Sequence, residues 1–236
     1  MMRLLSSIIM LFCSVLISAC KQEPAPDDYR QAMRDFVIAL RIHADTITPN
    51  FLLIPQNGEE LVTLGEGHET PPAEAYLTAI DGQGREDLLY GYSNDNQPTP
   101  EEDRAYMQGH LAVAEEHGVE VLVTDYCWDV NYMTASYEEN EIWGFISFSA
   151  RSRGLDIIPD YPDVPHNENG SNILTLSDAK NFLYLIDPNL FVNSSAYIAA
   201  LDATTYDMFI IDAFYDDQML TAEEVASLQT KPNGAR

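Results

Sequence analysis

The chain has 236 residues, of which 46% are hydrophobic, and this composition is typical of a folded protein rather than a disordered one. Its 12 Lys and Arg residues stand against 38 Asp and Glu residues, which gives a formal net charge of -26. A field of this sign repels nucleic acid and attracts cationic ligands, so the composition excludes nucleic-acid binding as the function. The same charge has a simpler interpretation, an acidic surface that maintains solubility.

The N-terminal residues have the pattern of a secretory signal. Arg3 supplies a positive charge, and Leu4–Ile17 is an apolar run of signal-peptide length that is short for a membrane span. The stretch that ends at Cys20, LISAC, resembles a bacterial lipobox. This resemblance implies cleavage of residues 1–19 and a lipid anchor on Cys20 in the bacterial cell envelope, at the outer membrane or the cell surface. An ordinary signal peptide and a true membrane anchor are the alternatives. Residues 20–28 are then expected to form an extended tether.

Helical and strand patterns alternate along the expected folded domain, residues 29–236. We expect helices over Asp28–Thr46, Ala73–Ile80, Thr99–His117, Val130–Asn140, Ser194–Leu201 and Thr221–Gln229. We expect strands over Phe51–Ile54, Asp87–Tyr92, Glu120–Tyr126, Gly144–Ala150, Asn181–Ile186 and Met208–Phe214. The apolar positions of the first predicted helix recur near a helical period, and they are Met33, Phe36, Val37, Leu40 and Ile42. This alternation is typical of a parallel sheet covered by helices.

The predicted strands favour an α/β fold of the (β/α)8 TIM-barrel type, incomplete in this chain. Complete barrels have eight strands and run to about 250 residues, whereas six strands are predicted here. The alternative is an open doubly wound sheet, but no glycine-rich phosphate loop follows the first predicted strand. A loop rich in Pro, Asn and Asp over Arg151–Ser177 is long enough to suggest a functional role.

The stretch Phe51–Leu61 (FLLIPQNGEEL) joins a predicted buried strand to a series of polar side chains. Gln56 and Asn57 follow the apolar run and its proline, and two carboxylates come next, at Glu59 and Glu60. Many α/β enzymes present their reactive groups in this way at the carboxyl edge of a sheet. The structural alternative is that the Asn-Gly pair forms only a turn and the two acids only begin a helix.

Four segments of the chain resemble one enzyme family. They are Phe51–Leu61 (FLLIPQNGEEL), Ile80–Tyr92 (IDGQGREDLLYGY), Val121–Tyr126 (VLVTDY) and Gly144–Ser149 (GFISFS). They look like the endo-α-1,4-polygalactosaminidase-type glycoside hydrolases of glycoside hydrolase family 114, which are bacterial (β/α)8 barrels. The resemblance spans most of residues 30–236 and implies an endo-acting hydrolase of an α-1,4-linked galactosamine polysaccharide.

The order of these segments departs from the family. Strands like Asn181–Ile186 and Met208–Asp212 open the family's barrel, whereas here they follow the PQNG strand, as if the barrel were circularly permuted. Strands like YxSIGEAE and GFDGVYLD, the second with an aspartate expected to be catalytic, have no counterpart in this sequence. Two alternatives therefore stand beside the hydrolase: a glycan-binding surface lipoprotein that lacks catalysis, and a gene fragment.

Glycoside hydrolysis requires two carboxyl groups that flank one bond. Acids at the ends of parallel strands converge on one face of a barrel, even when they are distant in sequence. We predict that Glu60 is the general acid and that Glu86 is the second catalytic carboxyl group. The other candidates are expected to bind the amino sugar, and they are Gln56, Asn57, Asp81, Asp125, Tyr126 and Asp212. Each has a structural alternative as a cap, a turn or a strand-edge residue.

Metal and cofactor chemistry have no support in the sequence, because the five His residues show neither an HxH nor an HExxH spacing. With Cys20 lipidated, the expected mature chain has one further cysteine, Cys127, which is predicted to be a packed thiol. Aromatic residues near the strand ends suit either sugar stacking or packing, and they include Tyr92, Trp128 and Trp143. The expected partners are an amino-sugar polysaccharide and, through Cys20, a membrane.

Overall fold

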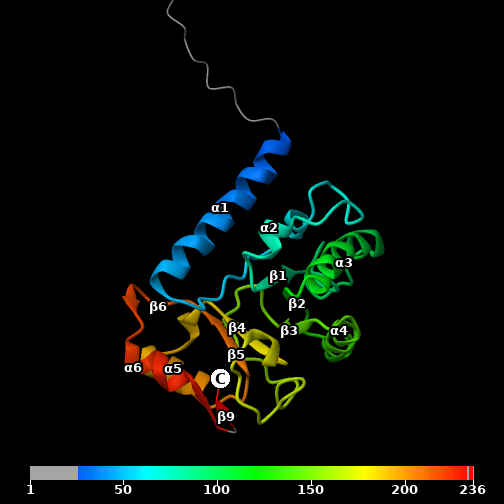
Figure 1. Ribbon diagram of the computed structural model, residues 1–236. Coiled ribbons are helices and arrows are strands. Elements are labelled where there is room, and N and C mark those ends of the chain that lie inside the picture. The colour runs from blue at the N-terminus through cyan, green and yellow to red at the C-terminus, as the bar shows by residue number, and fades with distance from the viewer. Residues whose placement is uncertain (1–25, 233, 236) are drawn as a thin grey trace, which may run out of the picture.

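The computed structural model describes residues 26–232, 234 and 235, so the signal peptide and Cys20 lie outside the described residues. The helices are α1 Pro26–Ile47, α2 Glu74–Leu77, α3 Glu101–Glu116, α4 Val130–Trp143, α5 Ser194–Asp202 and α6 Ala222–Leu228, with short 3-10 turns at Glu59–Val62, Leu176–Asp178 and Pro188–Leu190. The strands are β1 Gly82–Glu86, β2 Glu120–Tyr126, β3 Ile146–Ala150, β4 Phe182–Leu185, β5 Met208–Ile211, β6 Phe214–Tyr215, β7 Gln218–Met219, β8 Thr230–Lys231 and β9 Gly234–Ala235. Figure 1 shows the longer strands at the centre of the molecule, with helices around them.

The central strands are parallel and follow one another in chain order. β1, β2 and β3 form one sheet, and β4 pairs with β5 in a second. The chain just before Gln56 extends the first sheet, since Asp81 donates its N–H to the Leu53 carbonyl at 2.9 Å and Gly84 donates to the Pro55 carbonyl at 2.8 Å. The fold is therefore α/β with parallel sheets, and no sheet closes into a barrel within the described residues.

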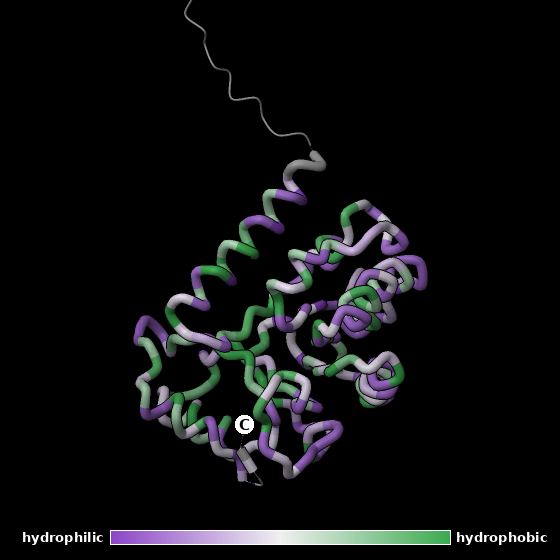
Figure 2. The backbone as a smooth tube through the Cα atoms, viewed as in Figure 1, coloured by the Kyte–Doolittle hydropathy of each residue, from purple (hydrophilic) through white to green (hydrophobic). Residues whose placement is uncertain are grey.

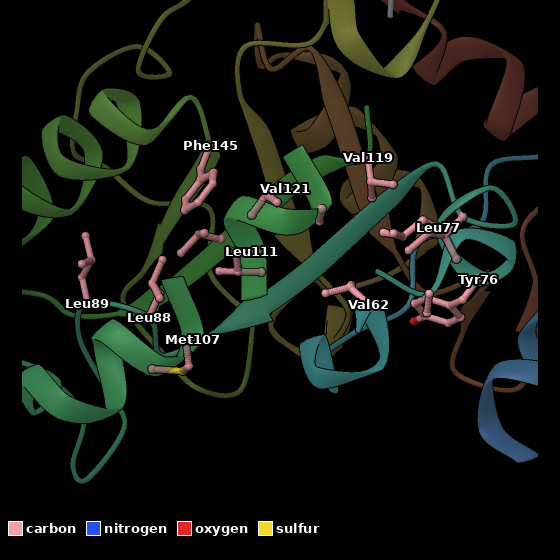
Figure 3. Packing of buried hydrophobic residues seen from close by; sticks show 14 of the residues in the cluster. Val62, Tyr76, Leu77, Leu88, Leu89, Met107, Leu111, Val119, Val121 and Phe145 are labelled. Carbon is pink, nitrogen blue, oxygen red and sulfur yellow. The ribbon is translucent and has the colours of Figure 1, made fainter. Parts of the chain in front are cut away.

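Side chains alternate between the two faces of β2, and this alternation divides the core. Val121 and Val123 pack on the face covered by α3, against Leu111 and its neighbours, as Figure 3 shows for Val121. Leu122 and Tyr126 face the other way, toward β4, β5 and α5. Because successive strand residues point to opposite faces, even-numbered residues of β2 line the inner face of the sheet and odd-numbered ones the helix face.

The predicted first helix is present as α1, but most of its apolar positions are exposed. Val37 is buried, but Met33, Phe36 and Leu40 are 49%, 58% and 40% exposed. The helix is instead fixed by arginines that donate to backbone carbonyls: Arg34 bonds the carbonyls of residues 61 and 63, and Arg41 bonds those of residues 51 and 79. Burial lowers the pKa of Arg34, and the charge of a neighbouring arginine acts in the same direction.

Two predicted strands have the wrong residue ranges. Asp87–Tyr92 was expected to be a strand, but β1 ends at Glu86 and the chain then turns, with Asp87 at φ 61° and Gly91 at φ 118°. Its apolar residues Leu88 and Leu89 pack in the helix-side core instead of continuing a strand. In the first predicted strand, Phe51 is half exposed and pairing with β1 begins only at residue 53.

The other predicted helices and strands lie close to their observed ranges, except that α2 covers only four residues of the predicted Ala73–Ile80 helix and β5 ends at Ile211, before the predicted end at Phe214. The Thr221–Glu224 capping box at the start of α6 is present, and α4 ends at Gly144 in the left-handed conformation that favours glycine. Figure 2 shows hydrophobic residues concentrated in the central strands. In the part of the chain that the structure describes, every helix is too short or too polar to cross a bilayer.

Candidate functional site

Three of the predicted site residues meet at the carboxyl ends of the first parallel strands. Asn57 donates its side-chain N–H to Glu86 Oε2 at 3.0 Å and accepts the Glu86 backbone N–H at 3.0 Å. Tyr126 donates its hydroxyl to Glu86 Oε1. Glu86 lies at the end of β1 and Tyr126 at the end of β2, and the inner face of the sheet carries both. We call this group of residues, Asn57, Glu86 and Tyr126, the Glu86 site.

The Glu86 site is built from local backbone geometry as well as from side chains. Asn57 has φ 59° and Gly58 φ 70°, so the chain turns sharply after it pairs with β1 through the Gly84 carbonyl. Asparagine and glycine are the residues that adopt left-handed conformations most readily. The PQNG sequence therefore forms the predicted turn, and that turn is what aims the Asn57 amide at Glu86.

A second tyrosine, Tyr184 of β4, lies near the same carboxylate. Burial and then the charge of Glu86 raise the pKa of Tyr184. For Tyr126, burial raises the pKa most, the hydrogen bond to Glu86 and its charge add to this, and the Arg153 guanidinium acts in the opposite direction. Both Glu86 oxygens accept a hydrogen bond, the arrangement that suits an ionised carboxylate, which can only accept.

Gln56 lies beside this group because β1 has no side chain at residue 84. A Cβ atom added to Gly84 would lie 2.0 Å from Gln56 Oε1, so the amide occupies the space that a larger residue would fill. Gln56 itself is exposed at the strand edge. A neutral amide is thus presented to solvent close to Glu86, as a polar group that a hydroxylated ligand can reach.

Arg153, which the sequence analysis did not single out, ties the loops of the site together. Its guanidinium donates to Asp87 Oδ1 at 2.8 Å and, through Nε, to Asp95 Oδ1 at 2.8 Å. Its Cζ lies 3.9 Å from the centre of the Tyr126 ring. Basic residues are scarce in this chain, with 12 Lys and Arg in all. A positive charge in the long loop after β3 was therefore the one feature of the sequence that could have pointed to Arg153.

Asp125 is placed differently from the expectation that it binds substrate. It is an odd-numbered residue of β2, it is fully buried, and it faces α4. Its Oδ1 accepts the Leu89 and Tyr90 backbone N–H groups at 2.7 and 3.1 Å, and Oδ2 accepts the Ser136 hydroxyl at 2.7 Å and the Asn140 amide at 3.2 Å. Asp125 therefore connects three elements of the fold and has no surface for a ligand.

The other predicted acids do not join Glu86. Asp81 precedes β1, at the opposite edge of the sheet, where it accepts the Leu53 N–H at 2.7 Å and pairs with Arg41. Glu60 faces α3: after burial, its charge is the next cause that raises the pKa of Tyr106 on that helix. Asp212 follows β5 at the carboxyl edge and is exposed, with Oδ1 accepting the Phe214 N–H at 3.0 Å.

Exposed aromatic side chains stand in the loops after β1 and β2. Tyr92 is 48% exposed and Trp128 is 51% exposed. Trp143 is also exposed, but it ends α4 and so lies before β3, at the other edge of the sheet. Tyr90 is buried against Tyr132, with ring centres 4.9 Å apart. Tyr92 and Trp128 thus offer exposed aromatic rings in the loops that follow β1 and β2.

A cavity formed by the described residues lies away from the Glu86 site. It measures about 940 Å³ and runs along β5 to the beginnings of β1 and β2, with Leu52, Phe209 and Ile211 among its lining residues. Three acids line it, Asp81, Glu120 and Asp207, and the first and last of these are ion-paired with arginine and lysine. The other lining residues are mostly apolar, and the residues of the Glu86 site lie at the opposite edge of the first sheet.

No group of three or more metal-ligating side chains occurs among residues 26–232, 234 and 235. A scan against protein-family models finds no match for this chain, and a search of curated proteins finds no similar sequence.

Proposed function

We propose that this protein is a glycoside hydrolase that acts on an α-1,4-linked galactosamine polysaccharide, with Glu86 as a catalytic carboxyl group. The observation that carries the proposal is the Glu86 carboxylate, half-buried at the carboxyl edge of a parallel sheet and held by Asn57 and Tyr126. Catalytic groups of parallel α/β enzymes occur at this edge. The resemblance of the PQNG and EDLLYGY segments to polygalactosaminidases supports the same reaction.

The chemistry requires the carboxylate to lie beside the sugar and not inside the core. Glu86 satisfies this, because it lies at the carboxyl end of β1 and is only partly buried, and because the nearby Gln56 is exposed. Asp212 is exposed at the carboxyl end of β5 and is assigned to binding a sugar ammonium group. Trp128 and Tyr92 offer ring faces on which a pyranose can stack. The net charge of -26 favours the approach of a polycationic, partly deacetylated polymer.

We propose that the fold belongs to the (β/α)8 type and that Cys20 carries a lipid anchor in the cell envelope. The succession of neighbouring parallel strands in chain order supports the barrel. The LISAC sequence supports the anchor, although Cys20 lies outside the described residues. An anchored hydrolase would act on polysaccharide at the cell surface.

A second candidate function is glycan binding without hydrolysis. It is favoured by the state of the carboxylates next to Glu86, because Asp87 and Asp95 are both paired with Arg153. Hydrolysis needs a second carboxyl group on the same bond. Glu60, the acid predicted for that role, faces α3.

The two candidates are separated by hydrolysis of partly deacetylated poly-galactosamine, followed by mass spectrometry of the products. We expect the wild-type protein to release oligosaccharides and Glu86→Gln to lower kcat by at least about 10²-fold, as loss of a catalytic carboxyl group does. Glu120→Gln, at the other end of the same strand pair, is the matched control and should retain wild-type activity.

Glu60→Gln tests the prediction from the sequence that Glu60 is the general acid. Because Glu60 lies beside α3 and not at the Glu86 site, we expect this variant to remain active. Hydrolysis that survives Glu86→Gln would contradict the proposal. Binding of the polymer without cleavage by any variant would establish the second candidate instead.

A further inference from the structure

Arg153 occupies a position that its ion pairs alone do not explain. An exposed ion pair contributes little to stability. Here, however, one guanidinium contacts four groups: Asp87, Asp95, the Gly91 carbonyl at 3.1 Å and the face of the Tyr126 ring. All but Tyr126 belong to the loop after β1, Tyr126 ends β2, and Arg153 itself follows β3.

The loop after β1 is shaped around this guanidinium. Asp87 has φ 61°, a left-handed conformation that a non-glycine residue keeps only when its surroundings impose it. Gly91 has φ 118°, and a Cβ atom there would lie 2.2 Å from Asp87 Oδ1 and 3.1 Å from Arg153 Nη2. The same Cβ would lie 3.1 Å from Tyr126 Cβ. Glycine at residue 91 therefore allows Asp87, Arg153 and Tyr126 to approach one another.

We propose that Arg153 is a positioning residue that acts on Glu86 through Tyr126. The guanidinium covers one face of the Tyr126 ring and is itself fixed by two carboxylates, so the ring is held where its hydroxyl donates to Glu86 Oε1. A cation over the ring also withdraws electron density from the phenol, which makes the hydroxyl a stronger donor. Arg153 thus sets the orientation of the carboxylate without contacting it.

The effect of Arg153 on the Tyr126–Glu86 hydrogen bond does not depend on what the protein hydrolyses. Its effect on catalysis rests on the proposed function. The test therefore uses two measurements on the same variants. The first is the NMR signal of the Tyr126 ring carbon that bears the hydroxyl, in protein labelled with ¹³C at that position and assigned by its absence in Tyr126→Phe. The second is kcat and KM on poly-galactosamine.

We expect Arg153→Gln to shift the Tyr126 signal in the same direction as Glu86→Gln does, because both changes weaken the same hydrogen bond. Arg153→Lys keeps a cation but loses the planar fork, so its shift should lie between those of wild type and Arg153→Gln. Arg151→Gln is the matched control: it removes an arginine two residues away, paired with Asp160, and should leave the signal in place.

In the kinetic measurement we expect Arg153→Gln to lower kcat by about 10- to 100-fold with little change in KM, the effect of a displaced catalytic group. A Tyr126 signal that is unchanged in Arg153→Gln but moved in Glu86→Gln would overturn the proposal. If Arg153→Gln fails to fold, Asp95→Asn takes its place, because it removes one of the two carboxylates that hold the guanidinium. We expect Asp95→Asn to shift the Tyr126 signal less, in the same direction. The absence of any shift would overturn the proposal. Absence of hydrolysis in wild type would remove the proposed function and leave the NMR result to decide the role of Arg153.

Discussion

Replacing Lys231 with methionine is expected to destabilise the protein by about 3–5 kcal/mol, because it leaves a buried carboxylate without its cation. Lys231 Nζ lies 2.5 Å from Asp207 Oδ1, and neither side chain has any exposed surface. Nζ also donates to the Asn169 carbonyl at 3.0 Å, while Asp207 Oδ2 accepts from the Asn169 amide at 2.6 Å and the Lys180 N–H at 2.8 Å. The pair joins β8, the start of β5 and the long loop after β3.

The free energy of unfolding in urea measures this effect. Lys180→Met is the matched control, since the Lys180 side chain is exposed, its Nζ donates to the Ser177 carbonyl, and the substitution keeps the backbone N–H that donates to Asp207; a change within about 0.5 kcal/mol is expected. The double variant Asp207→Asn with Lys231→Met removes the uncompensated charge and should recover a large part of the loss. A Lys231→Met protein as stable as wild type would show that Asp207 finds another partner or protonates at no cost.

Asp125→Ala is the second variant for which we expect a large loss of stability. It removes the acceptor of two buried backbone N–H groups, those of Leu89 and Tyr90, at about 1–3 kcal/mol for each donor left without a partner. Asp125→Asn is the matched control. Its oxygen can still accept both N–H groups, and its amide can donate to the Ser136 hydroxyl, so we expect near wild-type stability at neutral pH.

The stability of wild type should also fall with rising pH because of Asp125. Burial raises the pKa of Asp125 to about 6 from 3.8, while the hydrogen bonds from Leu89 and Ser136 act in the opposite direction. Between these values the folded chain keeps a proton that the unfolded chain releases, so folding is favoured at the acidic end and the contribution is lost as pH rises through 6. The difference of about two pKa units corresponds to about 3 kcal/mol.

The pH effect is measured as the free energy of unfolding of wild type minus that of Asp125→Asn, between pH 4 and pH 7. The subtraction removes the contributions of other titrating groups. We expect the difference to decrease across this range, and a difference that is constant or rises with pH would contradict the account of Asp125.

How far the sequence predicts this fold depends on how each strand is built. β2 was predicted with its observed bounds, because EVLVTDY combines β-branched residues with a helix-capping glycine just before it. β1 was missed because GQGRE contains no apolar residue. Its place is fixed by pairing with β2 and with the chain near Pro55, which is tertiary information, and its glycines leave room for Gln56 and Leu176.

The candidate site also contains residues that the sequence predicts and residues that it does not. Asn57, Glu86 and Tyr126 were all chosen from their positions near predicted strand ends, and the structure brings them together. Asp125 was chosen by the same argument but faces the helices, because neighbouring strand residues alternate in direction and the sequence does not say which face is inner. Arg153 was missed because its partner Asp87 is 66 residues away along the chain.

Calorimetric titration of a galactosamine oligosaccharide and its N-acetylated counterpart into wild type and Glu86→Gln tests whether the Glu86 site binds an amino sugar. We expect wild type to bind the oligosaccharide with free ammonium groups more tightly than the acetylated one, because Glu86 presents a partly exposed carboxylate to it. We also expect Glu86→Gln to lose most of this preference while its thermal unfolding is little changed. Equal affinity of wild type for both sugars, or a preference that persists in Glu86→Gln, would contradict the claim that the Glu86 site binds an amino-sugar glycan.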